Sequence, residues 1–287
     1  MFVANEKKLA VAVIHGMGDQ ASHFADGLID ALSKRLKRSR RAAVSPDAVL
    51  FKPIWWAPVI QGREDDMWRA MKSGGELDFQ SLRRFVLSNL GDAVAYQQEP
   101  GVNNTTYAAI HSCVADTLGD MRATLGVDRP LLLLAHSLGG AILSNYIWDR
   151  QNGTHAPTPF ERMETLCGFV TFGCNIPLFT LAYRKVESIE FPPPSLQQHY
   201  PQLAPVAQWL NFYDRDDVLG WPLRPLGQFN GDATSPRRYD KAVSQDIEIN
   251  VGGPLASWNP LSHSDYWTDD DFTEPVADLI ATLLANC

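Results

Sequence analysis

The sequence predicts an α/β fold, in which a mainly parallel sheet is covered by helices on both faces. Three observations support this prediction. Short apolar runs alternate along the chain with helical patterns. The runs are apolar throughout, which is typical of parallel strands that are buried on both faces. The chain has 287 residues, of which 45% are hydrophobic, and we therefore expect residues 1–287 to form a single domain.

The first strand is predicted over residues 9–14, where LAVAVI ends at a loop that reads HGMGDQ. A helix is expected over about 21–36, because leucines recur there at helical spacing, and a second strand over 48–54. Residues from about 52 to 101 contain many aromatic residues and are broken by prolines and a Gly-Gly pair. We interpret this segment as an insertion that forms helices over the sheet edge or a cap, with aromatic side chains that are typical of a core.

The second half of the chain continues the alternation. Residues 106–125 have the pattern of a long amphipathic helix, which Gly126 ends. The strongest predicted strand, 131–135, runs into a helix that extends to about Trp148. A segment rich in proline, 191–205, predicts an irregular surface excursion. The other strands and the last helix are expected at 166–172, 208–213, 246–251 and 272–285.

Charge and cysteine content bear on the partners. The net charge of −8 disfavours nucleic acid, because phosphate binding needs clustered positive charge. A basic run within residues 34–41 is typical of a solvated helix C-terminus, and a peripheral contact with anionic lipid head groups is the alternative. The cysteines form no CxxC pair, so we expect free thiols rather than a disulfide framework or a zinc site. They are Cys113, Cys167, Cys174 and Cys287.

The sequence also predicts where the protein resides. Its N-terminal region has too short an apolar run for a signal peptide. No stretch approaches the ~18 apolar residues of a membrane-spanning helix. We therefore expect a cytoplasmic protein without a cofactor or a metal, and the sequence leaves the oligomeric state open.

A serine lies at the turn between the strongest strand and the next helix, in the motif Ala135-His136-Ser137-Leu138-Gly139. This motif is typical of a nucleophile elbow, with alanine in place of the first glycine. Small residues on either side let the turn close, and the N-terminus of the following helix favours a developing negative charge. We predict that Ser137 is the nucleophile, and we expect His136 to point elsewhere and to be structural.

An acyl-transfer site also needs backbone donors for the oxygen of its tetrahedral intermediate. The residue after the nucleophile supplies one of them in such elbows, so we predict the N–H of Leu138. The second donor is expected from the turn His15-Gly16-Met17-Gly18, and we choose the N–H of Met17. A simple glycine turn is the alternative interpretation of this segment.

A base and an acid are expected after the nucleophile, in the chain order Ser, Asp or Glu, His. His263 is the histidine that follows the last predicted strand, in a loop with Tyr266 and Trp267 as neighbours that hold it, and we predict that it is the base. Three aspartates follow the strand at 208–213 and compete for the role of acid. We choose Asp216, because Val218 and Leu219 after it are expected to anchor the loop beneath it. Asp217 is second and Asp214 third, and we expect the two that are not the acid to be surface turn residues.

Together these segments resemble the α/β-hydrolase superfamily on its lipase and esterase side. HGMGDQ is similar to the oxyanion segment, AHSLGG to the lipase-type elbow, and FVTFGCNIPLF to the strand and turn that follow. In places the chain more closely resembles intracellular phospholipases of the DDHD type, through residues 89–96, 211–226 and 263–267. The resemblance implies an α/β-hydrolase fold over most of the chain, with Ser137, Asp216 and His263 as the catalytic triad.

These observations predict a serine hydrolase that cleaves carboxylic esters through an acyl-enzyme on Ser137. The substrate is expected to be a small-molecule or lipid ester. One alternative is a non-catalytic α/β-hydrolase scaffold used for binding, since a fold alone does not define a function. Another is a thioesterase, amidase or acyltransferase with the same triad, which the sequence does not separate from an esterase.

Overall fold

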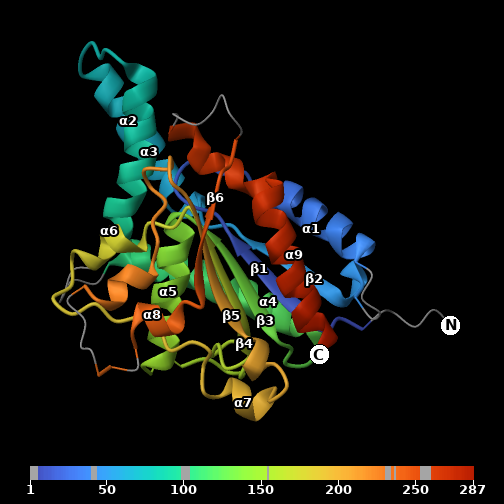
Figure 1. The fold of residues 1–287 in the computed structure, drawn as a ribbon. Coiled ribbons are helices and arrows are strands. Elements are labelled where there is room, and N and C mark those ends of the chain that lie inside the picture. The colour runs from blue at the N-terminus through green and yellow to red at the C-terminus, as the bar shows by residue number, and fades with distance from the viewer. Residues whose placement is uncertain are drawn as a thin grey trace.

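The computed structural model describes residues 6–39, 44–97, 104–153, 155–229, 234–235, 237–252 and 260–287. Among these residues, six parallel strands form one sheet in the order β2-β1-β3-β4-β5-β6. Helices lie on both faces of the sheet (Figure 1), which confirms the predicted α/β-hydrolase fold. The strands are β1 (Leu9–Ile14), β2 (Val49–Ile54), β3 (Leu131–His136), β4 (Leu166–Phe172), β5 (Gln208–Asp214) and β6 (Gln245–Ile249).

The strand limits agree closely with the predicted ones. Strands β1 and β4 have the predicted ends, and β2, β3 and β5 each differ by one residue at one end. Strand β6 ends at Ile249 rather than at Val251. It pairs with β5 only as far as Asp214, and the carboxylate of Asp214 accepts a hydrogen bond from the N–H of Val251 at 2.7 Å. The side chain of Asp214 thus replaces the backbone hydrogen bond that a neighbouring strand would supply to Val251.

Successive residues of the central strands enter two separate cores, as side chains on a pleated strand must. In β1, Ala10, Ala12 and Ile14 belong to one core, whereas the residues between them belong to the other. The near-continuous hydrophobic runs therefore serve both faces of the sheet. The first core contains side chains of α4 (Thr105–Leu125) and α5 (Leu138–Gln151), and the second contains those of α1 (Asp26–Arg38) and α9 (Asp270–Ala285).

Local capping explains where these helices begin and end. Helix α9 begins at Asp270, before the predicted start, because the side chain of Asp269 accepts a hydrogen bond from the N–H of Asp271. Helix α4 ends as predicted, since Gly126 takes a left-handed conformation with a φ of 72°. At the end of α1, Arg35 forms ion pairs with Asp270 and Glu274 of α9. This residue of the basic run therefore joins two helices, and residues 40 and 41 of the run lie outside the described residues.

Two helices, α2 (Pro58–Ser73) and α3 (Gln80–Tyr96), form a hairpin that extends away from the sheet (Figure 1). They account for most of the segment 52–101 that the sequence predicts to be an insertion; its residues 98–101 lie outside the described residues. Its aromatic side chains divide between two environments. Trp56 is fully buried, whereas Phe79 at the tip of the hairpin is 77% exposed, so the expectation that these aromatics form a core holds at the base of the hairpin only.

The remaining short elements lie in the connections. They are α6 (Ile176–Thr180), α7 (Leu196–His199), α8 (Tyr239–Ala242) and the 3₁₀ helices Pro46–Ala48, Ala204–Val206, Arg224–Gly227 and Pro260–Thr268. The proline-rich segment 191–205 is thus not wholly irregular, because it contains α7 and one of the 3₁₀ helices.

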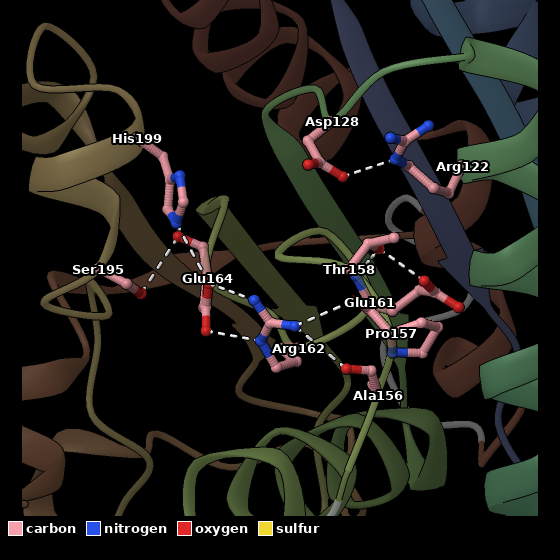
Figure 2. Close-up of polar contacts among 10 residues, drawn as sticks. All are labelled: Arg122, Asp128, Ala156, Pro157, Thr158, Glu161, Arg162, Glu164, Ser195 and His199. Atoms are coloured by element: carbon pink, nitrogen blue, oxygen red, sulfur yellow. Dashed lines mark hydrogen bonds and ion pairs between the residues drawn. The ribbon is translucent and has the colours of Figure 1, made fainter.

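A cluster of polar side chains holds α7 in place near the amino ends of β3 and β4 (Figure 2). The guanidinium of Arg162 binds Glu164, and the carboxylate of Glu164 lies 3.1 Å from Nε2 of His199. The hydroxyl of Ser195 donates to the backbone carbonyl of Glu164. Since parallel strands place all their amino ends at one edge, this cluster lies at the opposite edge from Ser137. His199 therefore has a structural contact with Glu164, far from Ser137.

Within the described part of the chain, no helix has both the length and the apolar character needed to cross a bilayer. The four cysteines are free thiols, as predicted.

Candidate active site

Ser137 occupies the turn between β3 and α5, where its backbone has a φ of 51° and a ψ of −124°. A residue other than glycine rarely adopts a positive φ, and this strain is typical of a nucleophile elbow. The glycines that follow allow close packing. A Cβ atom on Gly139 would lie 2.7 Å from the carbonyl oxygen of His15, and one on Gly140 would lie 2.6 Å from Sγ of Cys174. The motif therefore needs small residues because α5 is pressed against the neighbouring loops.

His263 lies directly beside this serine. Its Nε2 atom is 2.7 Å from Oγ of Ser137, although the two residues are 126 positions apart in the chain. The histidine belongs to the 3₁₀ helix Pro260–Thr268 rather than to an open loop, and it is buried. The structure thus brings together the two residues that the sequence predicts as nucleophile and base.

The acid beside His263 is Asp217, not the predicted Asp216. Oδ2 of Asp217 lies 2.9 Å from Nδ1 of His263, and Oδ1 lies 3.1 Å from it. Asp216 is exposed. The physical reason is the tight turn in which the N–H of Asp217 donates to the carbonyl of Asp214. The two central residues of this turn, Arg215 and Asp216, are exposed, whereas the fourth, Asp217, is buried.

Val218, which the sequence suggests as an anchor for this loop, is 70% exposed. Asp214, which was expected to be a surface turn residue if it was not the acid, is instead buried. Its carboxylate accepts hydrogen bonds from the N–H groups of Asp216 and Val251, so it holds the end of the turn in place.

Two further donors surround the carboxylate of Asp217. The N–H of Leu219 donates to Oδ1 at 2.9 Å, and the hydroxyl of Tyr266 donates to Oδ2 at 2.9 Å. Burial alone would raise the pKa of Asp217, but the interaction with His263 and these two donors hold it below its ordinary value. Asp217 is therefore ionised at neutral pH and able to stabilise a positive charge on His263.

Tyr266 ties this acid to the strand that carries it. Its hydroxyl accepts a hydrogen bond from the N–H of Asp214 at 2.9 Å while it donates to Asp217. The sequence suggests Tyr266 only as a neighbour that holds the histidine segment. Its contact with the acid was not predicted, because the residues are 49 positions apart.

The sequence suggests that His136 points away from the site, but the structure places its ring against the backbone of His263. Nε2 of His136 lies 2.7 Å from the carbonyl oxygen of His263, and the two imidazole rings are 4.8 Å apart between centroids. Burial and the neighbouring His263 lower the pKa of His136 to about 3. The ring is thus neutral at physiological pH, and its Nε2–H can donate to that carbonyl. His136 is structural in the sense that it fixes the backbone of His263.

The loop His15-Gly16-Met17-Gly18, called the HGMG loop below, lies against the serine. A Cβ atom on Gly16 would be 2.6 Å from Cβ of Ser137 and 3.1 Å from its Oγ, so only glycine allows this approach. Met17 is buried one residue later. Leu138 is the first residue of α5, where backbone N–H groups have no partner within the helix. Both predicted oxyanion donors therefore belong to segments that adjoin Ser137.

A cavity of about 230 Å³ lies along α5. Ala141, Ser144, Asn145 and Trp148 line it, and their spacing places them on one face of the helix. Ser137 directly precedes α5, and Ala141 lies within the first turns of the helix at the near end of the lining. Aromatic and polar side chains from other segments complete the lining, among them Tyr107, Phe179, Tyr183 and Tyr239.

The described residues contain no group of three or more His, Cys, Asp and Glu side chains that could hold a metal ion.

Comparisons with known proteins give matches among solved structures, two of which are at low sequence identity. No protein-family model matches the chain, and no curated protein matches it. Among solved structures, an esterase from Pyrobaculum calidifontis is 12% identical, with a TM-score of 0.42, and the match covers 98% of this chain and 77% of the esterase. The iron-lacking apo form of ESTFA is 11% identical, with a TM-score of 0.44 and coverages of 96% and 75%.

Proposed function

We propose that this protein is a serine hydrolase that cleaves carboxylic esters, with Ser137, His263 and Asp217 as its catalytic triad. The observation that supports this most directly is the continuous chain of hydrogen-bond distances from Oγ of Ser137 through both ring nitrogens of His263 to Asp217. Nucleophile, base and orienting acid in contact are the defining geometry of such a site. The correct chain order and the strained serine add to it.

In the proposed reaction, Oγ of Ser137 attacks the ester carbonyl carbon while its proton moves to Nε2 of His263. Asp217 holds Nδ1–H of the ring and stabilises the imidazolium that results. The tetrahedral intermediate then collapses, and the alcohol leaves with the proton from His263. In the second half, His263 takes a proton from water as the water attacks the acyl-enzyme, and Ser137 is released with its proton restored.

The negative oxygen of each tetrahedral intermediate would be bound by the N–H groups of Leu138 and Met17. The first belongs to the N-terminal turn of α5, where the helix dipole also favours negative charge. The second belongs to the HGMG loop, which Gly16 brings into contact with Ser137. Preorganised donors of this kind are usually the largest single contribution to acyl-transfer catalysis.

The proposal is tested by a fluorophosphonate probe, which reacts with activated serines. We expect one adduct per chain, located on Ser137 by peptide mass spectrometry. The Ser137→Ala variant should remain unlabelled, whereas Ser188→Ala, which removes a buried serine elsewhere, should be labelled as the wild type is. A folded wild-type protein that stays unlabelled would favour the non-catalytic scaffold instead.

We further propose that the cavity along α5 receives one arm of the substrate. Its lining combines aromatic rings with Asn145 and the carboxylate of Asp149. This favours an ester with an aromatic or hydrogen-bonding group over a long saturated acyl chain, because a polar lining would be left unpaired against such a chain. A lipid-like substrate, which the family resemblance suggests, has less support from this cavity.

Filling the cavity near the serine should therefore impair large substrates selectively. We expect Ala141→Phe to lower kcat/KM for aryl-acyl esters such as p-nitrophenyl phenylacetate by roughly tenfold or more, by analogy with the size discrimination of apolar pockets. Hydrolysis of p-nitrophenyl acetate should change little. Ala123→Phe, on an exposed position of α4, is the matched control. Equal losses for both esters with Ala141→Phe would place the substrate elsewhere.

A further inference from the structure

The HGMG loop is fixed from two sides by residues that precede and follow the hairpin turn between α2 and α3. On one side, Nε2 of His15 accepts hydrogen bonds from the N–H groups of Trp56 and Ala57, and the indole N–H of Trp56 donates to the carbonyl of His15. On the other side, the N–H of Gly18 donates to Oδ2 of Asp92 in α3 at 2.8 Å. The donor expected to bind the oxyanion, Met17, lies between these two attachments.

Asp92, which accepts the N–H of Gly18, has a second buried carboxyl group as its neighbour. It is 3% exposed, and Glu64 of α2, which is 7% exposed, lies beside it. Burial, and next the charge of Asp92, raise the pKa of Glu64, so the two carboxyl groups act on each other. The contact requires α2 and α3 to approach closely at Gly91, where a Cβ atom would come within 3.1 Å of Oε1 of Glu64.

We propose that Asp92 is a positioning residue for the oxyanion donor of Met17, and that the proton it shares with Glu64 makes this positioning depend on pH. The inference rests on the proposed esterase function. In the working form, Glu64 is protonated and donates to the carboxylate of Asp92, which in turn accepts the N–H of Gly18. This arrangement leaves one negative charge on the buried pair and holds the HGMG loop against Ser137.

Burial and the charge of the neighbouring carboxylate favour this shared proton. Burial, and next the charge of Asp92, raise the pKa of Glu64 to about 7, and burial likewise raises the pKa of Asp92. Arg84 and Ser88 of α3 favour ionisation of Glu64, and the N–H of Gly18 favours that of Asp92, whereas Asp19 opposes ionisation of Asp92. Arg84 is also engaged by Asp65 and by Asp19 at 3.8 Å, so its charge is divided among several acids.

The raised pKa of Glu64 determines how the stability of the protein changes with pH. The folded protein keeps a proton on Glu64 at pH values where the unfolded chain has lost it, so the pair contributes less to stability as the pH rises toward about 7. Above that pH two carboxylates face each other in a buried position. Their repulsion acts on the contact that holds Gly18, and the oxyanion donor loses its fixed position.

The test is the pH dependence of kcat/KM for p-nitrophenyl acetate in the wild type and in Glu64→Gln. The glutamine keeps a donor for Asp92 but cannot ionise. We expect the wild type to lose activity by roughly tenfold between pH 7 and 9, as small displacements of catalytic groups allow, and Glu64→Gln to keep a plateau there. Asp66→Asn, which removes an exposed acid paired with Arg69 on the same helix, should retain the wild-type profile. Identical profiles for the wild type and Glu64→Gln would overturn the inference.

Variants of Asp92 supply a second, independent measurement. We expect Asp92→Ala to lower kcat by roughly 10-fold to 100-fold with little change in KM, as weakening an oxyanion donor does. Asp92→Asn should restore much of kcat, because its amide oxygen can still accept the N–H of Gly18. Equal kcat in the wild type, Asp92→Ala and Asp92→Asn would contradict a positioning role.

Fluorophosphonate labelling of wild-type Ser137 distinguishes failure of the proposed function from failure of this inference. Absence of labelling refutes the esterase. Labelling of Ser137, together with wild-type kinetics in the Asp92 and Glu64 variants, refutes the inference alone.

Discussion

Replacing Ser137 by alanine is expected to lower kcat for ester hydrolysis by roughly 10⁶-fold, the scale seen when the nucleophile of a triad is removed. Without Oγ no acyl-enzyme can form, and His263 has no proton to accept. Only the oxyanion donors and substrate binding remain, and these leave a small residual rate. The rate should be measured with p-nitrophenyl acetate on protein that is free of other esterases.

The fold should survive this substitution, so the variant isolates the chemistry. Ser137 adopts a φ of 51°, and alanine in this conformation carries no larger steric cost than serine. Circular dichroism and thermal unfolding should therefore stay close to those of the wild type. Retention of more than a few per cent of wild-type activity by a folded Ser137→Ala variant would refute the proposed nucleophile.

Two adjacent aspartates provide the second prediction. Asp217→Asn is expected to lower kcat by roughly 10⁴-fold, as the equivalent change does in a well-studied triad. An amide in place of the carboxylate can present N–H to Nδ1 of His263, which stabilises the wrong tautomer and leaves the imidazolium without a counter-charge. Asp216→Asn, one residue away and exposed, should retain wild-type kcat.

Measuring the two variants side by side makes the comparison a matched one, since charge and size change equally in each. The depressed pKa of Asp217 adds a pH criterion. Activity that depends on ionised Asp217 should show no loss that sets in at or above the ordinary pKa of an aspartate. A severe loss in Asp216→Asn, with Asp217→Asn near normal, would restore the choice made from the sequence.

The fold was accessible to sequence analysis because it depends on local patterns. The apolar runs of β1 and β4 have the length and character of buried strands, and their limits were predicted to the residue. Gly126 marks a helix end through its own backbone. The turn at Ser137, between β3 and α5, follows from a motif whose small residues are required by close packing.

The parts that the sequence did not yield depend on contacts between distant residues. Which of three neighbouring aspartates reaches His263 is set by one tight turn and by Tyr266, and neither is visible in the spacing of acidic residues. The attachment of Gly18 to Asp92 spans 74 positions. A pattern of apolar residues predicts where elements lie, but not which side chains meet at their ends.

Ser137 has no surface open to solvent, and this has a kinetic consequence. An ester must reach Oγ through a transient opening, so only the fraction of molecules that is open at a given moment can react productively. Apparent affinity is reduced by that fraction. A substitution that merely eases access could therefore raise kcat/KM without touching any group that takes part in bond making.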